Sequence, residues 1–330
     1  MSKRSRLEQT LLGQPSDRTP IALWRHFGGD DQRAADHAHA VLWYQSQFEW
    51  DFVVAAPSNV YSVSGYGLQD AWTGDASSQR TIVQPLIQRS LQWTELRPLD
   101  PLRGELGKLY DALNLISDVL QSNATPLLPV IYSPLAQALR LAGRDQLLRH
   151  LRTQPDRLHS GLNTLTETTL RQIDSFRRLK LDGICYVVEL ADTSSLSEAE
   201  YLSFGLPYDS KIMDALSRQW WLNILRITGS SPMLRLFVNY PVQAIQWHTY
   251  DEHPSLDEGL RLWSGAVVGG LSSRDDLLLG TPPIVRDAAR RAIQISAGRR
   301  LILSAEGPHA SSVPLANLLA ARDVVKPTGG

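Results

Sequence analysis

The sequence predicts a (β/α)8 TIM barrel, an α/β fold, in which residues 1–330 form one domain. Short apolar runs alternate with longer amphipathic segments, and seven clear runs with one weaker run give the count of eight strands. The runs are apolar throughout, which is typical of parallel strands covered on both faces. Alternation of strand and helix over about 300 residues favours one closed barrel over an open sheet with a second domain.

The predicted elements follow one another along the chain. The strands are expected at residues 21–24, 52–56, 126–132, 183–190, 233–239, 244–248, 265–269 and 300–304. The helices are expected at residues 101–121, 155–180, 206–228, 281–297 and 314–324. Pro155 and Asp156 form a typical helix start. The Pro-Thr-Gly-Gly tail at residues 327–330 is expected to be frayed.

One segment after the second predicted strand interrupts this alternation. Residues 71–75 and 79–85 have the pattern of a short hairpin, with Gly74 and Asp75 in or near its turn. We expect this insertion to lie over the mouth of the barrel.

Composition limits the classes of ligand and location. A net charge of -1, from 33 basic and 34 acidic residues, gives no overall attraction to nucleic acid or to an anionic membrane. The single cysteine, Cys185, excludes a disulfide framework and a multi-cysteine metal site. The N-terminus lacks the apolar core of a secretory signal, and no run of about 18 apolar residues occurs. We expect a cytoplasmic protein with no bound metal or cofactor.

Motifs at both ends of the chain and between them carry a family resemblance. A basic segment, a glycine and the step Asp17-Arg18-Thr19-Pro20 lead into the first strand. Ser133-Pro134 follow the third strand, and Pro314 with Asn317 opens the last helix after a glycine-containing loop. This order resembles the uroporphyrinogen decarboxylases and their relatives, the corrinoid and coenzyme M methyltransferases. The resemblance implies the barrel fold and a ligand in its mouth.

The resemblance to the decarboxylases is incomplete at the functional positions. It implies two arginines that bind substrate carboxylates after the first strand; Arg25 occupies the first place and Gly29 the second. The aspartate that contacts the pyrrole nitrogens falls on Ser58, and the histidine after the last strand falls on Gly307. A hydroxyl group supplies no negative charge to stabilise a protonated pyrrole. The resemblance therefore implies the family more firmly than the decarboxylase reaction.

The methyltransferase branch implies a zinc ion held by a His-x-Cys pair at the fifth strand and a cysteine after the eighth. With the fifth strand expected at 233–239, the pair falls on Leu236 and Val238. The third ligand falls on Gly307. No zinc is expected at this place.

Polar side chains at predicted strand ends are the candidate catalytic groups, because a barrel places its reactive residues there. They are His26, Glu189 and Glu306. Each has a structural alternative, such as a histidine bonded in a turn or a carboxylate solvated in a loop.

A second set comprises the candidate substrate-binding residues. They are Arg25, Ser58, Asn59, Tyr61, Asp192, Asn239 and His309. Arg25 is expected to bind a carboxylate, or else to form a structural salt bridge. Asp192 either works with Glu189 or caps a turn, and Asn239 either donates to a ligand or forms a turn before Pro241.

Together these features predict a diverged, lyase-like enzyme that binds a small carboxylated or tetrapyrrole-like anion in the barrel mouth. Two alternatives stay open. One is a methyltransferase-like enzyme without the zinc site, with a corrinoid as partner. The other is a non-catalytic, ligand-binding or accessory barrel, because a fold does not by itself imply activity. A homodimer is one assembly that these hypotheses allow.

Overall fold

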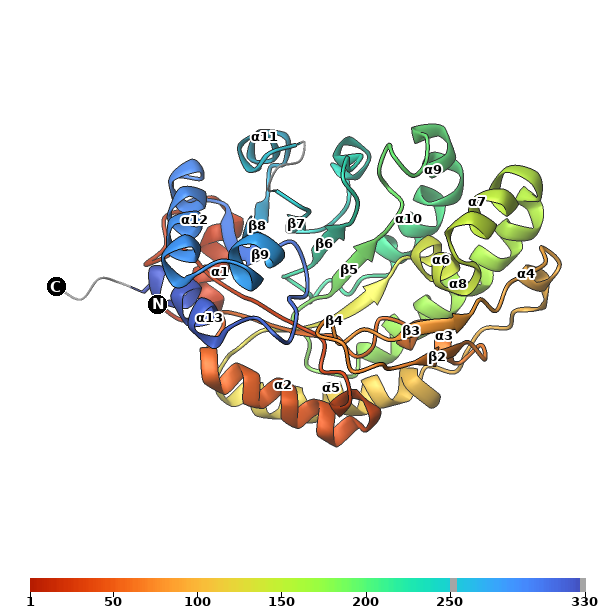
Figure 1. Ribbon diagram of the computed structural model, residues 1–330, viewed down its shortest axis with the longest axis horizontal. Helices are drawn as coiled ribbons and strands as arrows, with labels where there is room; N and C mark the ends of the chain where they lie inside the picture. Colours follow the sequence, from red (N-terminus) through yellow and green to blue (C-terminus); the bar gives the residue numbers. More distant parts are fainter. Residues whose placement is uncertain (250–253, 327–330) are drawn as a thin grey trace.

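A curled parallel sheet forms the centre of the computed structural model, which describes residues 1–249 and 254–326 (Figure 1). The predicted tail at 327–330 lies outside the described residues. Seven strands follow one another across the sheet in chain order. They are β1 (Val53–Ala55), β4 (Leu127–Tyr132), β5 (Cys185–Val188), β6 (Ile224–Ile227), β7 (Ala244–Gln246), β8 (Ala266–Leu271) and β9 (Leu301–Ala305). The α/β class and the parallel sheet agree with the prediction.

The first predicted strand, 21–24, is reduced to a single bridge. Ile21 pairs in parallel with Leu303 of β9. Its carbonyl oxygen also accepts a hydrogen bond from the backbone nitrogen of Asp51, at 2.9 Å. Ile21 therefore lies between the last strand and the segment that leads into β1.

Helices line the outside of the curled sheet, and α2 lies beside α5 (Figure 1). Those in the first half are α1 (Lys3–Leu11), η1 (Asp30–Gln32), α2 (Ala34–Phe48), α3 (Tyr61–Ser64), α4 (Gln92–Glu95), α5 (Gly104–Ser122), α6 (Pro134–Ala142), α7 (Arg144–Thr153) and α8 (Pro155–Phe176). Those in the second half are α9 (Glu198–Phe204), α10 (Leu206–Asp214), η2 (Leu234–Phe237), α11 (Leu256–Leu262), η3 (Ser273–Leu278), α12 (Pro282–Ile295) and α13 (Leu315–Val324). No helix among the described residues is long and apolar enough to cross a membrane.

Two predictions around the fifth strand are wrong. The expected helix 206–228 ends at Asp214 and is followed by β6, and the expected strand 233–239 is the short helix η2. The sequence could not separate these cases, because periodicity does not distinguish a short apolar run in a strand from one in a buried helix. Pairing decides the conformation: Ile224 of β6 is in register with Cys185 of β5 and with Ala244 of β7.

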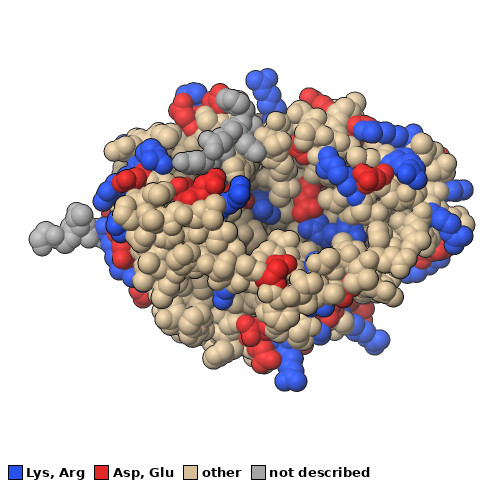
Figure 2. Space-filling view, in the orientation of Figure 1, with Lys and Arg blue, Asp and Glu red and all other residues tan. Residues whose placement is uncertain are grey.

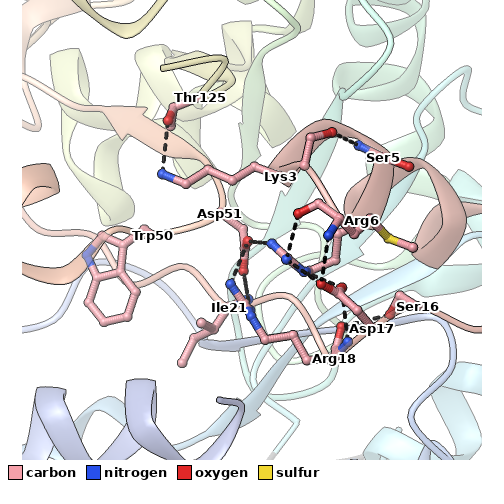
Figure 3. Close-up of polar contacts among 12 residues, drawn as sticks. Lys3, Ser5, Arg6, Ser16, Asp17, Arg18, Ile21, Trp50, Asp51 and Thr125 are labelled. Carbon is pink, nitrogen blue, oxygen red and sulfur yellow. Dashed lines mark hydrogen bonds and ion pairs between the residues drawn. The ribbon is translucent and has the colours of Figure 1, made fainter. Parts of the chain in front are cut away.

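An ionic network fixes the chain at the start of the sheet (Figure 3). Asp51 is fully buried, and its carboxylate accepts hydrogen bonds from Arg6 at 2.6 Å, from Arg18 at 2.8 Å and from the backbone nitrogen of Ile21 at 2.7 Å. Arg6 also donates to Asp17 at 2.7 Å. The Asp17-Arg18 step of the sequence thus joins α1, Ile21 and the entry to β1.

An antiparallel pair of strands follows β1 and α3. Its members, β2 (Gln69–Ala71) and β3 (Thr81–Gln84), lie apart from the parallel sheet. Trp72, in the segment between them, packs against Gly28 in the loop after the first bridge. The carbonyl oxygen of Ala76 accepts a hydrogen bond from the backbone nitrogen of Ser311, at 2.6 Å. The connection therefore contacts loops that follow the first and the last strands.

Candidate functional site

Charged side chains of both signs gather in a hollow near the middle of the molecule (Figure 2). Glu189 follows β5, Glu306 follows β9 and Arg226 lies near the end of β6, so these charges are at the carboxyl ends of parallel strands. We use the term mouth for the group formed by His26, Arg140, Glu189, Arg226 and Glu306. Three of these five residues were predicted from the sequence, and the two arginines were not.

Arg140 and Glu189 form a two-pronged ion pair in the mouth. Nη1 and Nη2 of Arg140 donate to the two carboxylate oxygens of Glu189 at 2.9 and 2.8 Å. Nε of Arg140 donates to the carbonyl oxygen of Asn59 at 2.6 Å, and the guanidinium lies 3.9 Å from the ring centre of Tyr132. Because both oxygens of Glu189 are occupied, this carboxylate balances and orients Arg140, and its role as a free catalytic base is not favoured by the geometry.

Arg226 supplies the open positive charge of the mouth. Its Nε donates to the carbonyl oxygen of Glu306 at 2.9 Å. Within the described part of the chain, its Nη1 and Nη2 atoms form no hydrogen bond or ion pair. A Cβ atom at Gly307 would lie 2.3 Å from Nη2, so the absence of a side chain there leaves room for the guanidinium. The arrangement offers two N–H edges to an anion.

Arg226 was missed because the sequence analysis placed it in a helix. Its signal in the sequence is a single charge within residues 222–227, which are otherwise apolar except for Asn223. The other three residues of β6 are buried, whereas Arg226 remains partly exposed. A lone charge in a buried parallel strand therefore indicates a side chain that faces the functional end of the sheet.

His26 is held as a neutral imidazole. Its Nδ1 lies 2.6 Å from the carbonyl oxygen of Pro57, which can only accept, so Nδ1 carries the proton. Burial lowers the pKa of His26 to about 4, and the positive charges of Arg226 and Arg140 act in the same direction. Its other nitrogen, Nε2, forms no hydrogen bond with another described residue.

Glu306 is held by the first residue of η3, the helix that follows β8. Its carboxylate accepts a hydrogen bond from the backbone nitrogen of Ser273 at 2.9 Å and another from the Ser273 hydroxyl. The carboxylate also lies 3.8 Å from Nε2 of His248, a histidine that the sequence analysis did not select. Glu306 is thus in the mouth, with its charge partly satisfied by the protein.

Two predicted residues lie on the side of the sheet that faces α2. The guanidinium of Arg25 stacks over Phe27, 4.7 Å from its ring centre, and Arg25 lines a pocket of about 460 Å³ that also includes Trp43. His309 lies 2.7 Å from the hydroxyl of Tyr44, and burial lowers the pKa of His309 to about 4. The structure does not bring Arg25 or His309 together with the Arg140–Glu189 pair.

The remaining predicted residues make contacts within the protein. Asn59 bonds through its side chain to the backbone of Arg80, at 2.8 and 3.1 Å. The Tyr61 hydroxyl donates to the carbonyl oxygen of Val130 at 2.5 Å, and Ser58 is buried. These contacts fix the loops around β1.

Asp192 and Asn239 differ from their expected settings. Asp192 is buried and accepts hydrogen bonds from the hydroxyl groups of Ser194 and Ser195, which favours its structural alternative as a turn cap. Asn239 is exposed and follows η2, so the expectation that it ends the fifth strand is wrong. Its predicted position depended on the misplaced strand.

The zinc positions must also be corrected. With Ile21 counted as the first strand, β6 is the fifth, so Leu236 and Val238 were the wrong positions for the ligand pair. The residues of β6 include neither histidine nor cysteine, and Gly307 has no side chain. Among the described residues, no group of three or more histidine, cysteine or acidic side chains is arranged to hold a metal. The donor set at these positions does not fit zinc.

Comparison with known proteins decides the family. The model of the uroporphyrinogen decarboxylase (URO-D) family matches residues 76–327. The chain belongs to the uroporphyrinogen decarboxylase family. This URO-D member is 28% identical over 238 residues to the uroporphyrinogen decarboxylase of Prochlorococcus marinus strain MIT 9303, an alignment that covers 67% of this chain and 64% of that protein.

Methyltransferases are also among the relatives of this URO-D member. Methylcobamide:CoM methyltransferase MtbA of Methanosarcina acetivorans is 20% identical over 335 residues, which covers 96% of this chain and 95% of that protein. The solved structure of a methyltransferase from Methanosarcina mazei has a TM-score of 0.85 at 18% identity and covers 98% of each chain. The shared fold and the predicted resemblance to both branches are thereby confirmed.

Proposed function

We propose that this protein is an enzyme that binds a small carboxylated ligand in the mouth, with Arg226 as the anion-binding residue. The observation that carries the proposal is the guanidinium of Arg226, whose Nη1 and Nη2 atoms have no partner among the described residues. Arginine binds carboxylates through paired, charge-assisted hydrogen bonds. Arg140 is less suited to this task, because Glu189 already occupies both of its terminal nitrogens.

For a lyase-like reaction, the position of the cation restricts which carboxylate it holds. Decarboxylation moves negative charge off the leaving carboxylate, so a cation bound to that group would stabilise the reactant more than the transition state. Arg226 is therefore assigned to a carboxylate that stays on the ligand. Uroporphyrinogen-like compounds carry several carboxylates and meet this requirement.

A methyltransferase-like reaction is the second candidate. It is favoured by the similarity to MtbA over 96% of this chain. Coenzyme M carries a sulfonate, an anion that Arg226 would bind in the same way as a carboxylate. The residues at the zinc positions do not fit a metal, so this candidate requires a thiol to be activated by other means.

The test is a calorimetric titration of the purified protein with uroporphyrin, coproporphyrin, coenzyme M and methylcobalamin. Arg226→Gln removes the proposed anion site, and Arg25→Gln is the matched control, since Arg25 lies outside the mouth. We expect saturable binding of one anion that Arg226→Gln weakens by at least about tenfold, from the loss of a charge-assisted hydrogen bond. Binding that depends on Arg25 instead, or no binding of any anion, contradicts the proposal.

Turnover then separates the enzyme from a binding protein. Products of the bound compound are followed by mass spectrometry, as loss of carbon dioxide or as transfer of a methyl group. Turnover that Arg226→Gln abolishes supports the enzymatic assignment. Tight, Arg226-dependent binding without turnover supports the non-catalytic barrel.

A further inference from the structure

We propose that Nε2 of His26 accepts a hydrogen bond from the ligand. The donor is an N–H or O–H group that lies beside the anion bound by Arg226. This inference deepens the proposed function and rests on its anion site. It assigns His26 to recognition of the ligand and narrows the class of ligand to acids that carry such a donor.

The orientation of the ring follows from one hydrogen bond. Nδ1 donates to the carbonyl oxygen of Pro57 at 2.6 Å, which fixes both the tautomer and the rotation of the imidazole. In this tautomer Nε2 has a lone pair and no proton, so it acts only as an acceptor. The His26 side chain is 3% exposed, so its surroundings hold the ring in place.

Within residues 1–249 and 254–326, no donor group is hydrogen-bonded to the acceptor at Nε2. This atom is not among the polar atoms sealed from solvent. The loop after β9 contacts both groups: Nε of Arg226 donates to the carbonyl oxygen of Glu306 at 2.9 Å, and the backbone nitrogen of His309 donates at 3.0 Å to the carbonyl oxygen of Trp24, two residues before His26. A buried acceptor without a partner destabilises a complex unless the ligand supplies a donor.

His26 stays uncharged at neutral pH, so the need for a hydrogen-bond donor on the ligand persists. Burial and the two guanidinium groups favour the uncharged ring, so Nε2 keeps its lone pair. A ligand with an N–H or O–H group next to its carboxylate satisfies both Arg226 and His26. A ligand with an acceptor in that place meets the lone pair of Nε2 and is rejected.

Pyrrole-2-carboxylate and furan-2-carboxylate form a matched pair of probes. They share ring size and carboxylate, but the ring N–H of the first is an ether oxygen in the second. We expect wild-type protein to bind pyrrole-2-carboxylate at least about tenfold more tightly in a calorimetric titration, because only this acid satisfies Nε2.

Two variants separate the two parts of the site. His26→Asn keeps an amide N–H for the carbonyl oxygen of Pro57 but removes Nε2. This variant should therefore bind the two acids with about equal dissociation constants. Arg226→Gln should weaken both acids equally. Thermal unfolding of each variant shows whether its fold is intact, and a second variant, His26→Ala, which also lacks an acceptor at the place of Nε2, replaces His26→Asn if the latter is unfolded.

The outcomes distinguish this inference from the proposed function. If both acids bind wild-type protein equally and both require Arg226, the anion site stands and the role of His26 is wrong. A preference for the pyrrole acid that persists in His26→Asn also overturns it. If neither acid binds in the millimolar range, the carboxylate site and the role of His26 both fail.

Discussion

Gly307→Ala tests the mouth without removing any charged group. The new Cβ atom would lie 2.3 Å from Nη2 of Arg226 and 2.7 Å from its Cζ, so the guanidinium must move by about 1 Å or more to reach ordinary contact distance. Such a shift disrupts at least one charge-assisted hydrogen bond to a bound carboxylate, worth about 1.5–3 kcal/mol. We therefore expect the dissociation constant to rise by about 10- to 150-fold.

The effect on folding should be much smaller. The clash falls on the end of a flexible side chain, and alanine also restricts the unfolded chain, so we expect a change of no more than about 1 kcal/mol in the free energy of unfolding. Gly65→Ala is the matched control, because its Cβ atom would meet Cδ1 of Leu99 at 2.8 Å, outside the mouth. Titration of the anion identified for the wild type, together with urea denaturation, measures both quantities. Unchanged affinity in Gly307→Ala, or an equal loss in Gly65→Ala, refutes the reasoning.

Three further predictions concern carboxylates that make hydrogen bonds within the fold. Asp51→Ala should lower the free energy of unfolding by about 3–5 kcal/mol in urea denaturation, because it leaves Arg6 and its neighbours without their buried partner; a loss below about 1 kcal/mol would contradict this. Glu189→Gln should destabilise the fold by about 1–3 kcal/mol in the same urea denaturation through the unbalanced charge of Arg140, and an unchanged free energy of unfolding would contradict this. Burial raises the pKa of Asp209 to about 6, above its ordinary value of 3.8, so its contribution to stability is complete below about pH 4 and is lost as the pH rises through 6. The free energy of unfolding of the wild type, relative to that of Asp209→Asn, should fall by about 3 kcal/mol between about pH 4 and pH 6. A difference that does not change with pH would contradict the raised pKa of Asp209.

Much of the sheet was predictable from local sequence. The runs that became β4, β5, β8 and β9 are short, apolar and bounded by helical patterns, and the structure places strands in them. Apart from the first predicted strand, which is a single bridge at Ile21, the failures lie between residues 206 and 239, where a strand was taken for the end of a helix. There the apolar run is only a few residues long, and its pairing with β5 and β7 decides its conformation.

The candidate site was only partly predictable, because a side chain's position at a strand end does not specify its partner. Glu189 was selected, but its partner Arg140 comes from α6, within a segment that carried no functional signal. Arg25 was selected from its place after the first strand, but its guanidinium stacks on Phe27. The direction of each side chain depends on packing that the local sequence does not encode.

The sequence by itself determined the α/β class, the family and the lack of any strong overall charge, since these depend on composition, periodicity and motif order. Tertiary structure alone decided which charges meet in the mouth. Arg140 contacts Asn59 across 81 positions of the chain, and Arg226 contacts Glu306 across 80. Contacts of this kind arise when the sheet curls and brings the ends of separate strands together, and no local pattern reports that geometry.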